Sequence, residues 1–464
     1  MNSTSEICPR CELLSAKVTA LAFELERVRE QLAAAKKNSA TSSKPPSSDI
    51  VKPKPSQSPD GQSRSIGGQP GHERHRRESF PPERVTTFET HKLQACPGCG
   101  GALRLNPTNP RLIQQVDIET TPLTIEQHTC PEYWCDCCRK PCWAPFPLRI
   151  ERGGLVGPRL TALIAFMKGG CHASYSTIRT FLRDCVGVTL ARSTLANTIS
   201  KVSEALDGPY DELLRLLPDE PVLNIDETGH KSGQKLWWTW CLRADLYTIF
   251  KIDPHRSADV LMDLLGRDFE GTIGCDYFSA YRRYMRECDI VIRFCLAHLI
   301  RDVRFLTTLP DEATKAYGER LRFALKALFE VIHRREEMPD VDFDRLLRAA
   351  RDVVLKAGMT DVPATRNAEN LAKRFHKHGA AFFTFVTTPG VDPTNNGAEQ
   401  AIRFVVIDRH ITQGTRSETG RRWSERFWTA IATCAGQGRS LYDYLKESVE
   451  NGFDGEPSPS LLPS

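Results

Sequence analysis

An ordered series of strand-like and helix-like segments between residues 221 and 294 constrains the fold of this 464-residue chain more than any other feature. Apolar runs rich in β-branched and aromatic residues predict strands, and apolar residues three to four positions apart predict a helix. The expected order is strands at 221–225, 236–242 and 246–252, a helix at 258–265, and strands at 271–275 and 290–294. A turn at Ala244 and Asp245 indicates an antiparallel meander, so we predict a mixed α/β sheet.

Two acidic residues directly follow strands in this series. Asp226 comes after the first strand and Asp276 after the fourth. The order of elements is that of a ribonuclease-H-like fold, in which the first and fourth strands are neighbours. We therefore expect the two aspartates to lie side by side.

A third carboxylate, Glu399, is expected on a capped helix that spans 394–403. A mostly helical segment at 311–390 interrupts the catalytic fold and explains the separation of 123 positions between Asp276 and Glu399. Three carboxylates brought together can hold two Mg²⁺ ions about 4 Å apart for phosphodiester chemistry. Arg403 and Arg409 follow closely and suit substrate phosphates, although surface salt bridges would use them equally well.

Length and composition favour several domains without a membrane segment. The 464 residues with 40% hydrophobic content are enough for about three domains. No uncharged apolar run reaches the roughly 18 residues that span a bilayer, and the N-terminus lacks the layout of a signal peptide. We expect a cytoplasmic protein without a membrane partner, whose 16 cysteines include metal ligands rather than disulfides.

Residues 1–37 are predicted to form a short coiled-coil helix that joins copies of the chain. Apolar residues recur at alternating spacings of four and three: Leu14, Val18, Leu21, Leu25, Val28 and Leu32. A single amphipathic helix packed on its own domain is the alternative, because the repeat spans under three heptads. Cys8 and Cys11 precede it, and two incidental thiols explain this lone pair better than a metal site.

Residues 38–82 are rich in Ser, Pro, Gly and Lys and are expected to be disordered when free. Positive charge is concentrated there: residues 36–77 hold nine Lys or Arg against three acids, a net +6, while the remainder sums to −2. Such an arm suits a phosphate backbone, with a merely solvated linker as the alternative.

Residues 83–150 are predicted to form a zinc ribbon. Two Cys-x-x-Cys knuckles, Cys96 with Cys99 and Cys135 with Cys138, are separated by 35 residues. Four thiolates at this spacing can close a tetrahedron around a structural Zn²⁺ and fold a small domain. Further cysteines crowd the second knuckle and leave the ligand choice open, and buried cysteines without metal are the alternative.

Residues 151–215 resemble a helix-turn-helix unit with a break at Gly187. Four polar residues would lie at the exposed start of a DNA-recognition helix: Arg192, Ser193, Thr194 and Asn197. Ordinary three-helix packing without DNA contacts shares the pattern and is the alternative.

Several motifs in this order resemble the insertion sequence 66 family of bacterial DDE transposases, over nearly the whole chain. They are Ser-Ser-Lys-Pro-Pro-Ser-Ser-Asp, Gly-Gly-Gln-Pro-Gly-His, Cys-Pro-Gly-Cys-Gly-Gly, Asp-Glu-Thr, Cys-Asp-Tyr-Phe-Ser-Ala-Tyr, Cys-Leu-Ala-His and Asn-Asn-Gly-Ala-Glu-Gln-Ala-Ile-Arg. The resemblance implies a catalytic triad of Asp226, Asp276 and Glu399, and a structural Cys-x-x-His element at Cys295 and His298.

The resemblance also implies Mg²⁺-dependent hydrolysis at transposon ends, with two ions and Mn²⁺ as a substitute, followed by attack of the freed 3′-hydroxyl on target DNA. Partners would be end and target DNA, further copies of the chain and accessory transposition proteins, at the bacterial nucleoid. Two other functions stay open from the residues alone. A non-catalytic DNA-binding regulator leaves the carboxylates unexplained, and a structure-specific nuclease needs no coiled coil.

The sequence thus predicts a multidomain α/β protein. Its expected parts are the coiled coil at 1–37, the linker at 38–82, the zinc ribbon at 83–150, the helix-turn-helix-like unit at 151–215, a ribonuclease-H-like catalytic core at 216–310 and 391–450, an α-helical insertion at 311–390 and a disordered tail at 451–464.

Overall fold

The computed structural model describes residues 9–36, 81–84, 99, 123–130, 132–135, 137, 139–388 and 390–463. The chain divides into two compact units, one made of Met1–Pro53 with Gln127–Ser464 and the other of Lys54–Glu126. The described part of the second unit includes one helical turn, η2 (Pro82–Arg84). All elements discussed below belong to the first unit.

Helix α1 (Pro9–Ala35) carries the predicted heptad seam. The six apolar side chains of the seam are between 49% exposed, at Val28, and 66% exposed, at Leu21. Covering an apolar stripe that is exposed to water lowers the free energy, so such a stripe favours association with another surface. The helix is present as predicted, and its pairing with a second copy stays a prediction.

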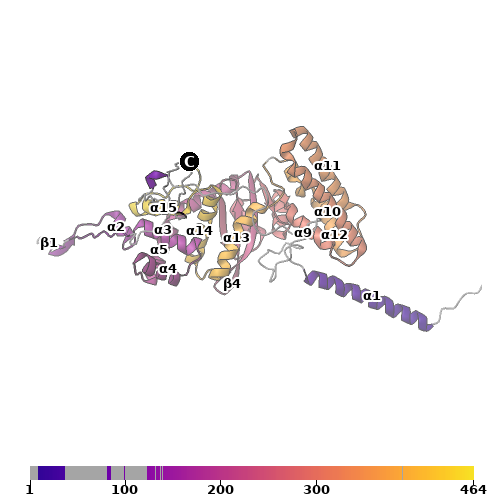
Figure 1. Ribbon diagram of the computed structural model, residues 1–464, viewed down its shortest axis with the longest axis horizontal. Coiled ribbons are helices and arrows are strands. Elements are labelled where there is room, and N and C mark those ends of the chain that lie inside the picture. Colours follow the sequence, from indigo (N-terminus) through magenta and orange to yellow (C-terminus); the bar gives the residue numbers. More distant parts are fainter. Residues whose placement is uncertain are drawn as a thin grey trace, which may run out of the picture. The chain divides into compact units, whose positions relative to one another are not determined.

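Five strands form one mixed sheet (Figure 1). They are β3 (Val222–Ser232), β4 (Lys235–Arg243), β5 (Thr248–Asp253), β6 (Thr272–Cys275) and β7 (Val291–Phe294), in the spatial order β5-β4-β3-β6-β7. β4 is antiparallel to both β3 and β5, whereas β6 is parallel to both β3 and β7. The predicted strands are therefore all present, and the first and fourth are neighbours.

Strand β3 is longer than the sequence pattern predicts. It does not end before Asp226 but continues to Ser232, because it pairs with β4 along this length, and Gly233, with a φ of +62°, then turns the chain into β4. Asp226 therefore lies inside the strand and pairs with Cys241 of β4. On its other side, β3 pairs with β6 only as far as Asn224, so β3 extends past the end of β6.

Helix α13 (Asn396–Thr412) covers one face of the sheet. It packs against β3 and β4, and the Cys241 thiol contacts the carbonyl of Ala398. Because Cys241 pairs with Asp226, both side chains lie on this α13 face.

Helices α7 (Ala258–Leu265) and α8 (Ser279–Cys288) connect β5 to β6 and β6 to β7. The bounds of α7 are those predicted from the sequence. Tyr281 of α8 packs edge-on against Trp240 with ring centroids 6.2 Å apart. Since Trp240 neighbours Cys241 on β4, it points to the opposite face, which we call the α8 face.

Helix α14 (Glu418–Gly436) lies along the edge strand β5. Three of its side chains, four residues apart, accept hydrogen bonds of 2.7–3.1 Å from alternate backbone N–H groups of the strand: Glu425 from Ile252, Thr429 from Phe250 and Thr433 from Thr248. Four residues of helix rise about 6 Å and two residues of strand about 6.6 Å, so the two spacings match.

The segment before the sheet is helical. It comprises α2 (Leu148–Gly153), α3 (Pro158–Ala165), α4 (Tyr175–Phe181), α5 (Arg192–Ala205) and α6 (Asp207–Leu216). α4 continues into a π-helical turn that ends at Gly187, whose φ is +78°, at the predicted break. Farther upstream, β1 (Glu132–Cys135) and β2 (Lys140–Trp143) form an antiparallel pair.

The prediction of a disordered tail at 451–464 is wrong for the described residues. Helix α15 (Leu441–Asp454) packs against α3, and the chain after it folds back. Leu461 is 1% exposed, and its carbonyl accepts a hydrogen bond from Gln437 at 2.8 Å. The Tyr444 hydroxyl binds the Pro459 carbonyl at 3.0 Å. Proline and serine suggested a free tail, but one buried leucine and these backbone contacts hold it.

The predicted helical insertion consists of α10 (Glu312–His333), α11 (Asp340–Met359) and α12 (Arg366–Phe382), which stand together beside α9 (Leu296–Leu306) in Figure 1. α12 packs against β7, and Thr384 just beyond it donates to the Ile292 carbonyl of that strand at 2.9 Å. Within the described ranges, no helix combines the length and apolar character needed to traverse a bilayer.

Candidate active site

The carboxyl ends of the parallel strands bring the two predicted aspartates together. Asn224 of β3 pairs with Gly274 of β6. Asp226 and Asp276 each lie two residues beyond this pair, just past the end of the parallel pairing, and the charge of Asp276 is close enough to act on Asp226. In open α/β sheets, ligands bind at this end of the strands.

Cys295 follows directly after β7 and fixes the start of α13. Its thiol accepts a hydrogen bond from the backbone N–H of Asn395 at 3.2 Å. The Asn395 side chain donates to the carbonyl of Ile225 at 2.8 Å. Helix α13 therefore begins next to the residue that precedes Asp226, and Glu399 follows one helical turn later.

Burial and like charge raise the pKa of both aspartates. Loss of hydration is the main cause at Asp226, whose pKa lies well above its usual range, and the charges of Glu227, Asp276 and Glu399 add to the shift. Burial likewise raises the pKa of Asp276 to about 6, with Glu227 as the next cause. Carboxylates whose ionisation is opposed in this way cluster at functional sites.

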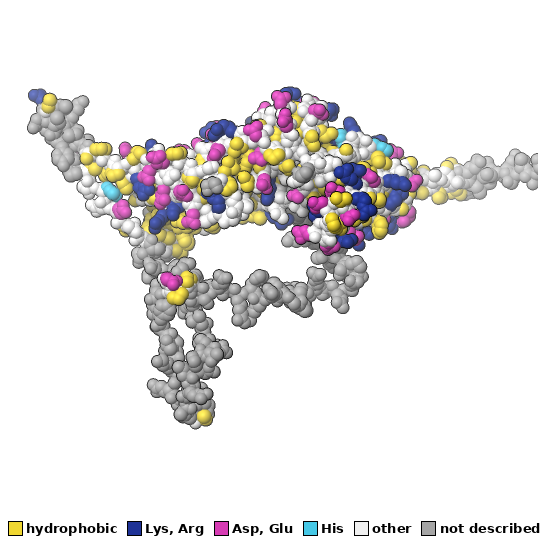
Figure 2. Space-filling view, turned by 90° about the horizontal axis from the view of Figure 1, so that it is seen from above, with side chains coloured by type: hydrophobic (Ala, Val, Ile, Leu, Met, Phe, Trp, Pro, Cys, Tyr) yellow, Lys and Arg dark blue, Asp and Glu magenta, His cyan; other side chains and the backbone are white. Residues whose placement is uncertain are grey.

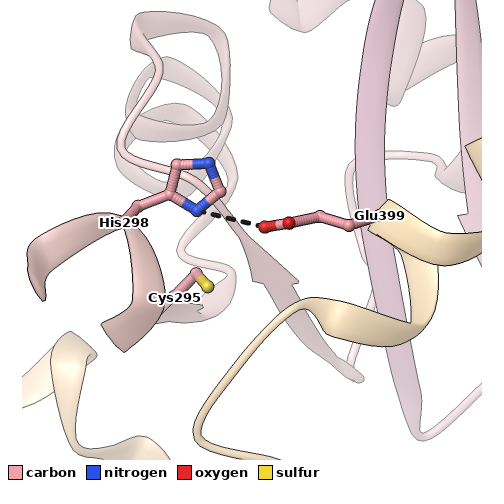
Figure 3. Close-up of side chains that lie close together, drawn as sticks. All are labelled: Cys295, His298 and Glu399. Carbon is pink, nitrogen blue, oxygen red and sulfur yellow. Dashed lines mark ion pairs between the residues drawn. The ribbon is translucent and has the colours of Figure 1, made fainter. Parts of the chain in front are cut away.

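Glu399 reaches from α13 toward α9, as Figure 3 shows. Its Oε1 lies 3.5 Å from His298 Nδ1, and its Oε2 lies 3.3 Å from Arg301 Nη2. Burial and the Arg301 charge lower the pKa of His298. One ligand atom each of Cys295, His298 and Glu399 lies within 4.8 Å of the other two. Glu399 thus lies beside the Cys-x-x-His element, and its charge also adds to the raised pKa of Asp226.

The aspartates suit divalent cations that prefer oxygen. Mg²⁺ is usually bound through one or two carboxylates, with water and substrate phosphates completing its shell. Asp226 and Asp276 offer such oxygens, and neither makes an ion pair with a described residue. A cation bound by both would favour their ionised forms and offset the burial and neighbouring negative charge that raise their pKa values.

The sequence reasoning missed the role of Glu227, which follows Asp226 but points to the α8 face. Its side chain is 1% exposed. It accepts hydrogen bonds from Arg256 Nε and Nη2 at 2.9 and 2.7 Å and from the Tyr281 hydroxyl. The Arg256 guanidinium lies 3.9 Å over the ring of Phe278. Strand alternation was the signal that this glutamate faces inward, but nothing in the sequence identified its partners.

A buried arginine, Arg293, was also missed. Asn224, Gly274 and Arg293 form the row before the aspartates across β3, β6 and β7. Arg293 is fully buried, and its Nη2 donates to Asn224 Oδ1 at 2.6 Å. It crosses over Gly274, where a Cβ would lie 2.1 Å from that nitrogen. The glycine within a strand was the available signal for such a close approach.

Residues 153–422 match the family model described as Transposase IS66 family. The chain belongs to this family. The matched range contains Asp226, Asp276 and Glu399. Membership confirms the resemblance and supports a general role in transposition, with DNA as the partner and DNA cleavage and joining as the class of reaction.

Further similarities extend beyond the IS66 transposase domain. Residues 6–78 match a family of unknown function. The uncharacterized protein y4jD of Sinorhizobium fredii (strain NBRC 101917 / NGR234) is 24% identical over 441 residues, 87% of this chain and 84% of the relative. The uncharacterized protein y4hP of the same strain is 22% identical over 383 residues, 73% of this chain and 67% of the relative.

A basic hollow lies at the N-terminal ends of α7 and α8 in this transposase domain. It has a volume of about 360 Å³ and is lined by Arg256, Arg282, Arg283 and Arg286 together with Ser257 and Ser279. Arg283 is paired with Asp259 at 3.1 Å and Glu287 at 3.0 Å. Arg282 instead lies over the ring of Tyr277 at 4.6 Å, without a carboxylate partner among the described residues.

The predicted DNA contacts differ in accessibility. Arg192, Ser193 and Asn197 are exposed at the start of α5, whereas Thr194 is half-buried; Arg403 is exposed on α13. Arg409 is turned inward and donates to Thr228 Oγ1 at 2.7 Å and to the Gly229 carbonyl. Basic and acidic side chains are intermingled on the face seen in Figure 2. Arg409 is therefore engaged within the fold.

Only some of the predicted zinc ligands are among the residues that the structure describes. Cys96 and Cys138 lie outside the described residues. Cys99 is exposed, and Cys135 is the last residue of β1, with its side chain outside the description. The zinc ribbon stays a prediction.

Proposed function

We propose that this chain is a DDE transposase that cleaves DNA at the ends of its insertion sequence and joins the freed 3′-hydroxyl to target DNA. Asp226, Asp276 and Glu399 would be its catalytic acids. The observation that carries the proposal is that Asp226 lies in β3 and Asp276 directly after its parallel neighbour β6, with the charges of Asp276 and Glu399 both close enough to raise the pKa of Asp226. Membership of the IS66 transposase family supports the reaction class.

The catalytic core would be ribonuclease-H-like. Its support is the strand order β5-β4-β3-β6-β7, in which three antiparallel strands are followed by two parallel ones. Helices α10, α11 and α12 would be an insertion between β7 and the helix that bears Glu399.

In this mechanism the three carboxylates provide oxygen ligands in fixed positions. When bound, two Mg²⁺ ions, or Mn²⁺ in their place, supply the charge that activates the attacking water or 3′-hydroxyl and stabilises the leaving oxygen. Asp226 is held by the pairing of β3 with β4, and Asp276 accepts a hydrogen bond from the Phe278 backbone N–H at 2.8 Å. Glu399 is held by the hydrogen bonds of Asn395 at the start of its helix. Arg282 in the basic hollow would bind a backbone phosphate of DNA beside Asp276.

The remaining parts would grip DNA and assemble the protein. We propose a structural Zn²⁺ at Cys96, Cys99, Cys135 and Cys138, and end recognition through Arg192, Ser193, Thr194 and Asn197. Exposed Arg403 would contact the DNA backbone. The exposed seam of α1 supports a homo-oligomer through a coiled coil.

An end-cleavage assay with the terminal sequences that flank the gene tests this function. The wild-type protein should nick these ends in Mg²⁺ or Mn²⁺ and not in chelator. Asp226→Asn, Asp276→Asn and Glu399→Gln should each lose cleavage and keep end binding. Asp245→Asn, in the exposed turn after β4, is the matched control and should cleave normally. Cleavage by Asp226→Asn protein at the wild-type rate would contradict the assignment.

A further inference from the structure

Two buried polar atoms face one another without a hydrogen bond at the point where α9 meets α13. His298 Nδ1 and Glu399 Oε1 are 3.5 Å apart, and neither has a hydrogen-bond partner among the described residues. A buried polar atom left in this way costs about 1–3 kcal/mol. A third atom that binds both His298 Nδ1 and Glu399 Oε1 would remove this cost.

A third ligand stands beside this pair. Cys295 is the N-cap residue of α9, and His298 lies in the first turn of the same helix, so both side chains face the start of α13 (Figure 3). The ligand atoms of Cys295, His298 and Glu399 lie within 4.8 Å of one another. The Asn395 N–H holds the thiol in place at 3.2 Å.

The donor set identifies the class of cation. Thiolate and imidazole select Zn²⁺ over Mg²⁺, which requires oxygen ligands. Zinc bonds of about 2.0–2.3 Å place tetrahedral ligand atoms about 3.3–3.8 Å apart, so the set has to close by about 1 Å. The Glu399 side chain is 27% exposed and can make this movement.

We propose that Cys295, His298 and Glu399 bind a zinc-type divalent cation, and that this cation draws Glu399 away from Asp226 and Asp276. The thiol proton of Cys295 leaves to solvent on binding, and a water completes four ligands. The metal site stands on its own geometry. Its regulatory consequence rests on the proposed function, because it matters only if Glu399 is a catalytic acid.

Arg301 competes with the cation for the same two side chains. Its Nη2 lies 3.3 Å from Glu399 Oε2, and its Nη1 lies 3.3 Å from His298 Nε2. A cation on Nδ1 requires the ring proton to be on Nε2, which then no longer accepts from Arg301. Arg301 thus holds Glu399 in the metal-free state and must turn away when zinc binds.

Zinc content of the full-length protein without DNA tests the site. The purified wild-type protein should hold one more equivalent of zinc than Cys295→Ser and His298→Gln proteins. Cys434→Ser removes a buried cysteine of α14 outside the cluster and should leave the zinc content unchanged. Comparing variants cancels zinc held by other cysteines. Glu399→Gln, with its partly exposed side chain, should fold normally and bind this zinc at least tenfold more weakly.

Arg301→Gln should strengthen zinc binding, because it removes the positive charge that competes with the cation. It should bind the same zinc at least threefold more tightly than wild type. Folded Cys295→Ser, His298→Gln and Glu399→Gln proteins with wild-type zinc content and affinity would overturn the site. Circular dichroism identifies which variants are folded.

Cleavage measurements then test the regulatory consequence separately. Wild-type protein that holds zinc at the cluster should cleave in Mg²⁺ at least tenfold more slowly than the same protein after its zinc has been removed. The same treatment should change cleavage by His298→Gln protein less than twofold. Zinc bound at the cluster without inhibition would overturn the withdrawal of Glu399 and leave the metal site intact. Absence of any cleavage by zinc-free wild-type protein, with zinc binding at the cluster intact, would contradict the proposed function alone.

Discussion

The two faces of strand β3 carry neighbouring carboxylates in opposite circumstances. On the α13 face, Asp226 lies close to Asp276 and Glu399 and makes no ion pair with a described residue. On the α8 face, Glu227 is 1% exposed and bound by both Arg256 and Tyr281. Asp226 is buried with a backbone hydrogen bond from Glu227 at 3.0 Å and no cationic partner among the described residues, whereas the charge of Glu227 is met by Arg256 and Tyr281.

This difference distinguishes a carboxylate suited to catalysis from one that stabilises the fold, at adjacent positions of one strand. A buried carboxylate with an arginine and a hydroxyl around it holds elements together, here β3, the segment before α7, and α8. A group of carboxylates without such partners lowers the stability of the fold. It persists where a ligand, typically a cation, neutralises the negative charge. The comparison therefore predicts opposite effects of neutralising the two side chains.

The largest expected effect is the loss of cleavage in Asp226→Asn protein, to the background of the uncatalysed assay. Its free energy of unfolding without metal should rise, because the substitution removes a charge that burial and three neighbouring carboxylates oppose. Denaturant unfolding in chelator, beside the cleavage assay, measures both. A lower stability in chelator would place Asp226 among the structural carboxylates and break the comparison.

Glu227→Ala should have the opposite profile and lose about 2–4 kcal/mol of unfolding free energy, because Arg256 and Tyr281 lose a common buried partner. Urea titration measures the loss. The matched control is Glu330→Ala on α10, whose side chain is 63% exposed and should change stability by under about 0.5 kcal/mol. An equal effect of both substitutions would contradict the structural role of Glu227.

Gly274→Ala tests the row that supports the aspartates. Its Cβ would meet Arg293 Nη2 at 2.1 Å and Asn224 Oδ1 at 2.4 Å, so we expect a loss of about 1–3 kcal/mol. Gly208→Ala on α6 has open space around the new Cβ and is the control. It should be neutral or slightly stabilising. If Gly274→Ala behaved as this control does, the arginine would not cross the strand there.

The pH dependence gives the smallest expected effect. The pKa of Asp276 is about 6 in the folded chain and 3.8 as its ordinary value, so the folded state binds the proton more tightly. Its contribution to stability is therefore present below about pH 4 and is lost as pH rises through 6, on the order of 2 kcal/mol in chelator. Subtracting the pH profile of Asp276→Asn protein isolates it. Mg²⁺-dependent cleavage should show the opposite dependence and decrease as the pH falls below 6, because protonated Asp276 binds the cation poorly.

Much of the sheet could be predicted because its signals are local. The helix at 258–265 has the predicted bounds, and the aspartates meet because strand order brings their strands together. The length of β3 could not be predicted, since its extension depends on pairing with β4 and not on its own apolar run. The ordered segment after α15 depends on a single buried leucine, Leu461.

The candidate site was predictable only in its carboxylates. Asp226, Asp276 and Glu399 carry recognisable local contexts. Arg256 lies 29 residues from Glu227 and Tyr281 lies 54 residues from it, so their contacts depend on tertiary structure alone. Arg409 illustrates the converse, because an arginine in a basic run turned inward to bind Thr228 and the Gly229 carbonyl.

The side chains along β5 have a consequence for how copies of this chain can meet. Glu425, Thr429 and Thr433 occupy outward N–H groups of that edge, and Thr384 binds the opposite outer strand through the Ile292 carbonyl. Strand addition from a neighbouring molecule is thereby obstructed on both sides, which also protects the sheet from edge-to-edge aggregation. Copies that gather on two DNA ends would have to meet through helices, and the exposed seam of α1 is a surface of that kind.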